Sequence, residues 1–320
     1  MSEQMPIQNL RAHLGHYIVG QTELVDRLLI GLLTGGHLLV EGLPGLAKTT
    51  AIKALAEGVH ANFKRIQFTP DLLPADLLGN EVYHPETREF TFEPGPLFNE
   101  IVLADEINRA PAKVQSALLE AMAERQVTVA GHSRDLPELF LVMATQNPLE
   151  QSGTYPLPEA QMDRFMLHVS LDYPEREDEY DILKRTLDGT LGTNPVGEAK
   201  NITVDQVLAA RESVRQVRCD EALQHWVVDV VAGTRKVGEL DPDLADQVLV
   251  GASPRGALAW VQAARAAAYL EGRDYIVPDD LIKLAADALR HRIILGPRAM
   301  VSGLTRDVVI DRLLELIPAP

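Results

Sequence analysis

Residues 42–49 of this 320-residue chain read Gly-Leu-Pro-Gly-Leu-Ala-Lys-Thr and directly follow an apolar run that begins at residue 37. The pattern predicts a phosphate-binding loop between a buried strand and a helix, because a tight glycine turn points successive backbone N–H groups at an anion. Lys48 can then reach the β- and γ-phosphates of a nucleotide, and the Thr49 hydroxyl can ligate Mg²⁺. The candidate nucleotide-binding residues of this stretch are Gly42, Pro44, Gly45, Leu46, Ala47, Lys48, Thr49 and Thr50.

Ala47 departs from the general form of this pattern, which has glycine before the lysine. An alanine is tolerable there if its backbone φ is already helical, so the departure weakens the motif without breaking it. Glycine-rich turns also precede helices for purely structural reasons, so the assignment needs support from a second motif.

The composition describes a globular protein, with 46% hydrophobic and 24% charged residues. No apolar run approaches the ~18–20 residues of a membrane span, and the first residues lack the pattern of a secretory signal. Cys219 is the only cysteine, so an intrachain disulfide is excluded and the cytoplasm is the simplest location. The net charge of −16 makes nucleic acid an unlikely partner, because phosphate-backbone binding needs concentrated basic charge.

The first part of the chain, residues 1–175, alternates strand-like apolar runs with helical patterns, which predicts an α/β fold with a mostly parallel sheet. Two short segments interrupt this alternation, and each has the pattern of a β-hairpin, one near residues 80–97 and one near residues 126–137. A helix is expected to begin near Asp71, with the first hairpin inserted into it or just after it. The other elements expected in the alternating part are strands His37–Glu41, Phe63–Thr69, Ile101–Ala104, Leu139–Ala144 and Met166–Leu171, and helices Lys48–Gly58 and Ala112–Glu124.

Strand patterns end at Pro174, and amphipathic helical stretches follow. Residues 176–200 are assigned as a linker region, because Gly189–Gly197 is rich in glycine and turn-forming residues. Residues 201–320 are predicted to form a smaller all-α domain. The helical stretches beyond Pro174 are Glu175–Leu187, Val204–Val217, Glu221–Arg235, Ser253–Glu271 and Pro278–Arg290.

Polar side chains stand at the ends of two predicted strands. Asp105 and Glu106 follow the strand at 101–104, and the carboxyl end of a parallel strand is where ligands bind in such sheets. Asp105 could hold Mg²⁺, and Glu106 could activate the attacking water. Asn147 follows the next strand and could orient that water near the γ-phosphate; its alternative role is turn formation before Pro148. The acidic pair and the loop at 42–49 together predict ATP binding.

Two arginines are further candidates. Arg164 could cap a helix or pair with Asp163, but it could also reach the nucleotide of a neighbouring subunit. Arg255 lies in the first turn of a predicted helix, where a cation opposes the helix dipole, and this position favours a specific anionic partner such as phosphate.

With these elements in this order, the chain resembles the MoxR family of AAA+ ATPases over nearly its whole length. The resemblance is carried by five motifs: residues 41–49, Asp105-Glu106-Ile107-Asn108-Arg109-Ala110, Ala144-Thr145-Gln146-Asn147-Pro148, Met162-Asp163-Arg164-Phe165 and Ala252-Ser253-Pro254-Arg255. Ala47 itself is typical of the family. Val19 and Gly20, within Ile18-Val19-Gly20-Gln21, resemble the family's adenine-pocket segment.

The resemblance implies an αβα P-loop core with a five-stranded sheet, a helical lid, and assembly into a homo-oligomeric ring, usually hexameric. It implies an Mg²⁺-dependent ATPase in which Glu106 is catalytic and Asn147 is sensor 1. Arg164 is then the arginine finger that acts across a subunit interface, and Arg255 is the sensor-2 arginine that acts from the lid. Arg109 is expected near the subunit interface. Members of the family are regarded as chaperone-like activators of other proteins, often with von Willebrand factor A domains, and the related magnesium-chelatase subunit drives metal insertion.

Two other functions compete with a ring-forming remodeller of protein clients. A nucleic-acid motor is the alternative from another class, and the inserted hairpin argues against it, because residues 80–97 hold four glutamates and one arginine. A nucleotide switch that binds ATP without hydrolysing it is the other alternative, and the presence of Glu106, Asn147 and Arg164 argues against it.

Overall fold

The computed structural model describes residues 4–149, 153–191 and 202–320. Its centre is a five-stranded sheet with strand order β2-β5-β8-β1-β9. Every neighbouring pair in this sheet is parallel, which confirms the predicted parallel α/β core. The strands are β2 (Phe63–Gln67), β5 (Ile101–Asp105), β8 (Leu141–Gln146), β1 (Leu38–Gly42) and β9 (Leu167–Leu171).

The sequence of each strand matches its place in the sheet. The central strands β5, β8 and β1 begin with buried apolar residues, as expected for strands covered on both faces. The edge strand β2 has the sequence Phe-Lys-Arg-Ile-Gln, in which only Ile66 is buried. The charged residues of β2 therefore stay at the rim, and the sheet ends there.

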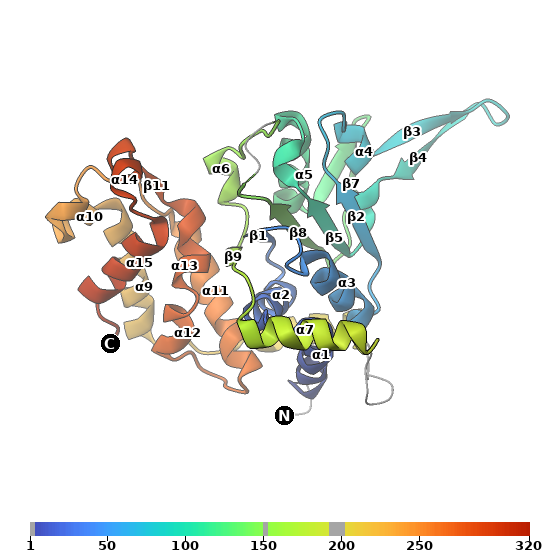
Figure 1. Cartoon of the computed structure of the whole chain (residues 1–320). Coiled ribbons are helices and arrows are strands. Elements are labelled where there is room, and N and C mark those ends of the chain that lie inside the picture. Colours follow the sequence, from blue (N-terminus) through green and yellow to red (C-terminus); the bar gives the residue numbers. More distant parts are fainter. Residues whose placement is uncertain (1–3, 150–152, 192–201) are drawn as a thin grey trace.

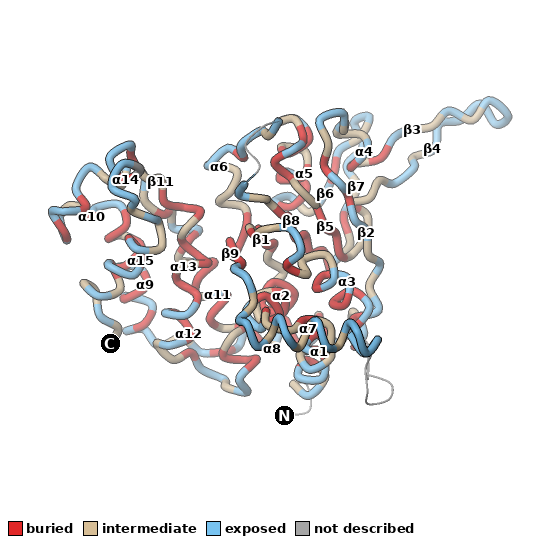
Figure 2. Tube along the Cα trace, in the orientation of Figure 1, coloured by how far each residue is buried: buried red, intermediate tan, exposed pale blue. Residues whose placement is uncertain are grey.

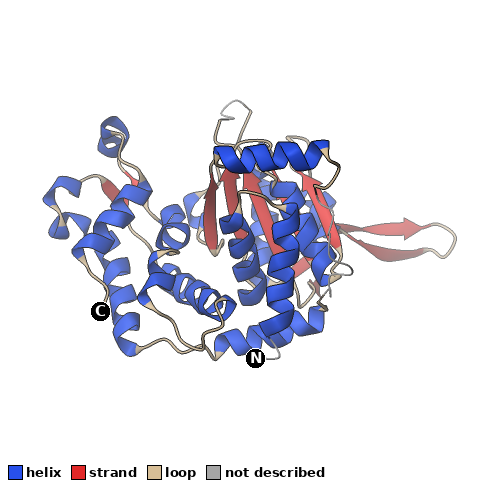
Figure 3. Ribbon diagram, turned by 60° about the horizontal axis from the view of Figure 1, so that its bottom comes forward, coloured by secondary structure: helices blue, strands red, loops and turns tan. Residues whose placement is uncertain are grey.

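Helices cover both faces of the sheet (Figure 3). On one face, α1 (Gln4–Tyr17), α2 (Thr22–Thr34) and α3 (Lys48–Val59) share a hydrophobic cluster with Leu38 and Val40. On the other face, α4 (Pro74–Leu78) and α5 (Ala112–Glu124) pack with Leu39 and Val142. Alternate residues of β1 thus belong to two separate hydrophobic clusters, one on each face of the sheet. Figure 2 shows the buried residues along these central elements.

Two hairpins lie outside the main sheet. The first pairs β3 (Gly79–His84) with β4 (Glu89–Pro94) and projects away from the body of the molecule (Figure 1). The second pairs β6 (Gln126–Val129) with β7 (His132–Asp135) through a two-residue turn. Both turn residues, Ala130 and Gly131, have positive φ, as a tight hairpin turn requires.

The remaining elements form a mainly helical lid beside the sheet (Figure 1). Helix α2 shares its hydrophobic cluster with α8 and α11 of this lid, so the apolar interior runs without a break from the sheet into the lid. Two further helices belong to neither group: α6 (Glu159–Met162) connects β8 to β9, and α7 (Arg176–Leu187) follows β9 and lies across α1 in Figure 1. The lid helices are α8 (Val204–Arg215), α9 (Glu221–Arg235), α10 (Val237–Leu240), α11 (Pro254–Leu270), α12 (Pro278–Ile282), α13 (Ala285–Leu289), α14 (Pro297–Ser302) and α15 (Arg306–Leu316).

The lid differs from its prediction in two details. The single helix expected over 278–290 is two short helices, α12 and α13, separated at Lys283 and Leu284. A two-stranded antiparallel sheet of β10 (Val248–Val250) and β11 (Ile294–Leu295) is also present. Strands this short carry too few residues for a period-two pattern. Of the linker assigned to 176–200, residues 176–187 form α7, and residues 192–200 lie outside the described residues.

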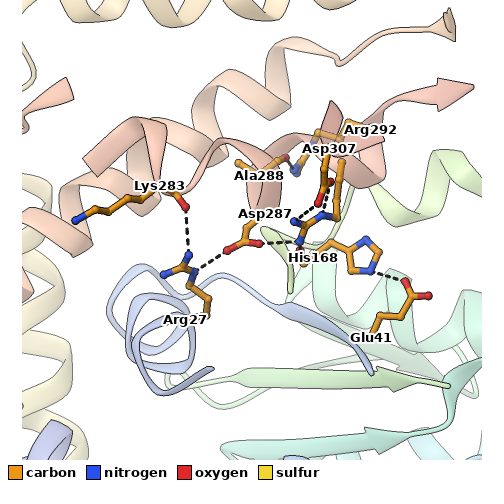
Figure 4. A network of polar contacts seen from close by, with 9 residues as sticks. Arg27, Glu41, His168, Lys283, Asp287, Ala288, Arg292 and Asp307 are labelled. Carbon is orange, nitrogen blue, oxygen red and sulfur yellow. Dashed lines mark hydrogen bonds and ion pairs between the residues drawn. The ribbon is translucent and has the colours of Figure 1, made fainter. Parts of the chain in front are cut away.

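A chain of ion pairs and hydrogen bonds joins the lid to the core (Figure 4). Arg27 of α2 pairs with Asp287 of α13 at 2.6 Å, and Asp287 also pairs with Arg290 at 2.7 Å. Arg290 donates to the backbone carbonyl of His168 on β9, and the His168 side chain contacts Glu41 at 2.9 Å. Glu41 directly precedes Gly42, so the network connects the lid to the start of the predicted phosphate loop.

Two buried histidines make stability depend on pH. His37 accepts a hydrogen bond from the backbone N–H of Val142 through Nδ1, and burial, with the charge of Arg125, lowers the pKa of His37 to about 3. Burial, with the charge of Arg292, lowers the pKa of His291 well below its usual value. An unfolded histidine titrates near pH ~6.5. Between that pH and the lower folded-state value, the unfolded chain binds more protons than the folded one.

We therefore expect the free energy of unfolding to fall as the pH drops below about 6.5. His37→Gln should make this dependence shallower, by up to one proton in the slope, because glutamine does not titrate. Urea unfolding at several pH values between 5 and 8 measures the slope. His225→Gln, on an exposed position of α9, is the matched control. Equal slopes for His37→Gln and the wild type would contradict the assignment.

Candidate nucleotide-binding site

The loop between β1 and α3 takes the shape of an anion cradle. Gly45 has φ of 89°, a conformation that favours glycine. Ala47 has φ of 55° and ψ of 17°, so the condition of right-handed helical φ under which alanine is easily tolerated is not met. Helix α3 begins one residue later, at Lys48. Ala47 is the residue before the helix, and its backbone adopts the left-handed conformation. Such a conformation costs about 1–2 kcal/mol for a residue with a Cβ atom.

Gly42 serves packing, not the loop conformation. A Cβ atom at Gly42 would lie 2.9 Å from the Cβ of Leu171 on the neighbouring strand β9. The end of β1 therefore needs glycine in order to pair closely with β9.

A cavity of about 400 Å³ opens in front of the loop. It brings together the predicted loop residues and the predicted polar strand ends, since the three segments meet at the carboxyl edge of the sheet. Gly42, Val19, Gly20, Arg164 and Arg255 do not line it. The cavity is lined by Pro44, Gly45, Leu46, Ala47, Lys48, Thr49, Thr50, Arg65, Asp105, Glu106, Thr145, Gln146 and Asn147.

Lys48 stands at the floor of this cavity. Its ammonium group donates to the backbone carbonyl of Gly42, which folds the side chain back along the loop. Burial lowers the pKa of Lys48, and the nearby carboxylates of Asp105 and Glu106 oppose that shift. The lysine is thus a cation held among acids, in position to meet an anionic ligand.

Asp105 is held by two partners. The Thr145 hydroxyl donates to Oδ1 at 2.6 Å, and Arg65 donates to Oδ2 at 2.6 Å. Asp105 and Thr49 supply oxygen atoms to one cavity, and oxygen is the donor that Mg²⁺ prefers. The donor set fits Mg²⁺ bound together with phosphate oxygens and water, and the ion would neutralise charge on the phosphates.

Glu106 also has a positive φ, of 57°. One oxygen of its carboxylate, Oε2, accepts two hydrogen bonds. Gln67 donates to Oε2 at 2.7 Å, and Arg109 donates to the same oxygen at 2.9 Å. The backbone N–H of Glu106 donates to the Thr145 hydroxyl at 2.9 Å. Thr145 therefore connects Asp105 and Glu106 and fixes the two carboxylates relative to each other.

Sequence reasoning did not identify Arg65, Gln67 or Thr145. Their position in the chain could have indicated them, because each lies among the last residues of a strand whose carboxyl end faces the phosphate loop. Asn147 lines the cavity as expected, and its side-chain oxygen accepts from the backbone N–H of Leu149 at 3.2 Å.

The segment with Val19 and Gly20 lies elsewhere. Gly20 has φ of 72°, and a Cβ atom there would lie within 2.9 Å of Asp178 and Pro174 at the start of α7. The neighbouring Gln21 donates to the carbonyl of Asp172 at 2.8 Å. This segment thus packs against the chain that leaves β9.

Arg164 and Arg255 line a second cavity, of about 380 Å³, between the core and the lid. Arg125 and Arg292 line it as well, and Asp163 is the one acidic residue among its described lining residues. Arg164 donates to the backbone carbonyl of Leu119 on α5 at 2.6 Å. The structure brings the two predicted arginines together, but not to the cavity that holds Lys48.

Comparisons with known proteins agree with this geometry. The model of the ATPase family associated with various cellular activities (AAA) matches residues 37–167, and the AAA lid domain matches residues 243–313. The fold and the two matches define the chain as a P-loop core of the AAA class followed by its lid.

Three relatives narrow the class. The chain is 45% identical to Chaperone MoxR1 of Mycobacterium tuberculosis over 95% of this chain and 79% of that protein. It is 31% identical to Protein MoxR of Methylorubrum extorquens over 95% of this chain and 92% of that protein. A crystal structure of a provisionally assigned ATPase from Cytophaga hutchinsonii has a TM-score of 0.90 and 41% identity, covering 100% of this chain and 96% of that one. The chain belongs to the MoxR family of AAA+ ATPases.

None of the helices formed by residues 4–149, 153–191 and 202–320 has the length and apolar character needed to cross a bilayer.

The conformation of Ala47 gives a direct test of the loop. Ala47→Gly should raise the free energy of unfolding by about 1 kcal/mol or less, because relief of left-handed strain exceeds the added entropy of glycine in the unfolded chain. Ala51→Gly, inside α3, is the matched control and should lower it by about 1 kcal/mol or more. Urea denaturation measures both. Equal destabilisation by the two substitutions would show that Ala47 is not strained.

Proposed function

We propose that this protein binds Mg²⁺-ATP and hydrolyses it to ADP and phosphate, and that it uses the energy to remodel or activate protein clients. The observation that carries the proposal is the convergence of Lys48, Asp105 and Glu106 on one cavity behind an anion-binding loop. Phosphoryl transfer requires mainly positioning and charge stabilisation, and these residues supply both.

Each residue of the cavity has a separate part in this proposal. The N–H groups of residues 44–50 and the Lys48 ammonium hold the phosphates. Thr49 and Asp105 hold the metal ion, and Asp105 exchanges its contact with Arg65 for it. Glu106 accepts a proton from the attacking water, and Asn147 orients that water. Val19 and Gly20 are proposed to border the adenine.

The second cavity is our reason for proposing a homo-oligomeric ring. Arg164 and Arg255 lie together and do not line the cavity of Lys48, so we propose that both reach the nucleotide of an adjacent subunit. Four arginines and a single aspartate line this cavity, so it is suited to bind the negatively charged triphosphate of a nucleotide held by another subunit. A hexamer is the ring size that the family resemblance favours.

The projecting hairpin β3–β4 is proposed as a contact surface for a protein client. Its strands expose Tyr83 and Phe90, whose rings lie 5.1 Å apart. Around this pair stand Glu81, Glu86 and Glu89. A client with a von Willebrand factor A domain, in the cytoplasm, remains the partner we propose. The acidic character of the hairpin disfavours the nucleic-acid motor.

Lys48→Ala should lose tight ATP binding, because the phosphates lose their nearest cation. Glu106→Gln should still bind ATP but hydrolyse it at a small fraction of the wild-type rate, since an amide cannot accept the proton. Equilibrium binding of a fluorescent ATP analogue and steady-state phosphate release distinguish the two effects. Unchanged ATP affinity in Lys48→Ala would exclude the phosphate-loop assignment.

Arg164→Ala should reduce the hydrolysis rate by about 10³–10⁵-fold if Arg164 acts as an arginine finger. Mixing Arg164→Ala subunits with Glu106→Gln subunits should restore part of the activity, because some interfaces then combine an intact arginine with an intact glutamate. Subunit exchange is verified separately with labelled chains. Mixed rings without any recovered activity would mean that Arg164 acts within its own subunit.

A further inference from the structure

The carboxylate of Asp163 is shared between two elements of the lid. Arg292, in the short helical turn Arg290–Arg292, donates from Nε to Oδ1 at 2.6 Å. Ser253, the residue before α11, donates from its hydroxyl to Oδ2 at 3.1 Å. Asp163 directly precedes Arg164, so a core residue next to the proposed arginine finger is bonded twice to the lid.

Ser253 extends this connection to the second arginine. Its hydroxyl oxygen accepts from the backbone N–H of Arg255 at 3.2 Å, which caps α11. A hydroxyl can donate and accept at the same time, so both bonds of Ser253 coexist. Two consecutive hydrogen bonds therefore lead from the Asp163 carboxylate to the backbone of Arg255.

Arg292 holds the same turn from the other side. Its guanidinium also donates to the backbone carbonyls of Asp163 at 3.2 Å and Phe165 at 2.8 Å, the residues on either side of Arg164. The Arg292 side chain is 2% exposed. Burial lowers its pKa, and the ion pair with Asp163 opposes that shift. A buried guanidinium with this many acceptors has a fixed orientation, so the backbone around Arg164 is fixed to the lid.

We propose that Asp163 is a positioning residue that fastens the Arg164 turn to α11, so that Arg164 and Arg255 are presented to the neighbouring nucleotide as one unit. The inference rests on the proposed action of both arginines across a subunit interface. It assigns to the carboxylate no contact with the nucleotide. Its consequence is that a movement of the lid carries the backbone of Arg164 with it.

Asp163→Asn tests this inference with little change in shape. The single amide oxygen of asparagine cannot replace both the ion pair with Arg292 and the hydrogen bond from Ser253, so the unit loosens. A misplacement of about 1 Å in a catalytic group costs on the order of 10²-fold in rate. We expect kcat for ATP hydrolysis to fall about 10–100-fold, with ATP affinity within about twofold of the wild type, because the cavity of Lys48 is untouched. Asp229→Asn, on the exposed side of α9, is the matched control and should leave both unchanged.

Mixing experiments separate positioning from general damage. Asp163→Asn should recover activity when mixed with Glu106→Gln subunits, because the two defects lie on opposite sides of the interface. It should not recover when mixed with Arg164→Ala, because Asp163 and Arg164 act from the same side. The double variant Asp163→Asn with Arg164→Ala should be slower than Arg164→Ala alone by much less than the roughly 10–100-fold that Asp163→Asn costs by itself, because only the positioning of Arg255 is left to lose. Recovery with Arg164→Ala, or wild-type kcat in Asp163→Asn, would overturn the inference.

Two further measurements keep the outcomes distinct. Full activity in Arg164→Ala would contradict the proposed interface action itself, whereas an inactive Arg164→Ala beside a fully active Asp163→Asn would contradict only the role of Asp163. If Asp163→Asn does not fold, Ser253→Ala removes one contact and leaves the ion pair with Arg292. It should lower kcat several-fold with the same mixing behaviour, and wild-type kcat in Ser253→Ala would likewise overturn the inference.

Discussion

Parallel pairing of β1 with β8 on one side and β9 on the other is the constraint on which the rest of the molecule depends. Parallel strands have their carboxyl ends at one edge, so the loop after β1 and the polar ends of β5 and β8 must meet there. The close approach of β1 and β9 in turn requires glycine at residue 42. The same pairing presents Glu41 to His168, and through His168 and Arg290 to the lid. One register of hydrogen bonds thus sets both the shape of the cavity and its link to the lid.

Much of this arrangement is predictable from sequence, because the signals are local. The bounds of α5 agree with the predicted Ala112–Glu124, since an apolar face and polar flanks define them within one segment. The positive φ of Ala47 was not predictable, because alanine is rarely placed there and only the geometry of the loop demands it. Arg65 and Thr145 were missed since their importance comes from the carboxylate that each contacts, and that contact joins segments about 40 residues apart. The meeting of Arg164 with Arg255 depends on how the lid is placed, and no local pattern encodes it.

The core and the lid are joined by two kinds of interaction with different consequences. The apolar cluster that includes α2, α8 and α11 is non-directional, so it stabilises the union of the two parts without fixing one geometry. The ion pairs of Arg27 and Arg292 are directional and short, and they select one placement of the lid among those that the apolar contact allows. Breaking a few directional bonds while keeping the apolar contact would allow the lid to shift without separating. This combination keeps Arg164 of the core and Arg255 of the lid beside one cavity while the lid stays able to shift.

The hairpin β3–β4 has two long edges that no third strand of the described chain covers, and such edges are templates for pairing with another chain. Its composition counteracts that hazard. Glu81, Glu89 and Glu93 place negative charge along the ribbon, and Pro94 at its end removes a backbone donor. Charge at a sheet edge opposes the approach of a second identical ribbon. The acidic residues that distinguish this hairpin therefore also protect the protein from edge-to-edge aggregation, so a ribbon with two open edges is kept closed to copies of itself.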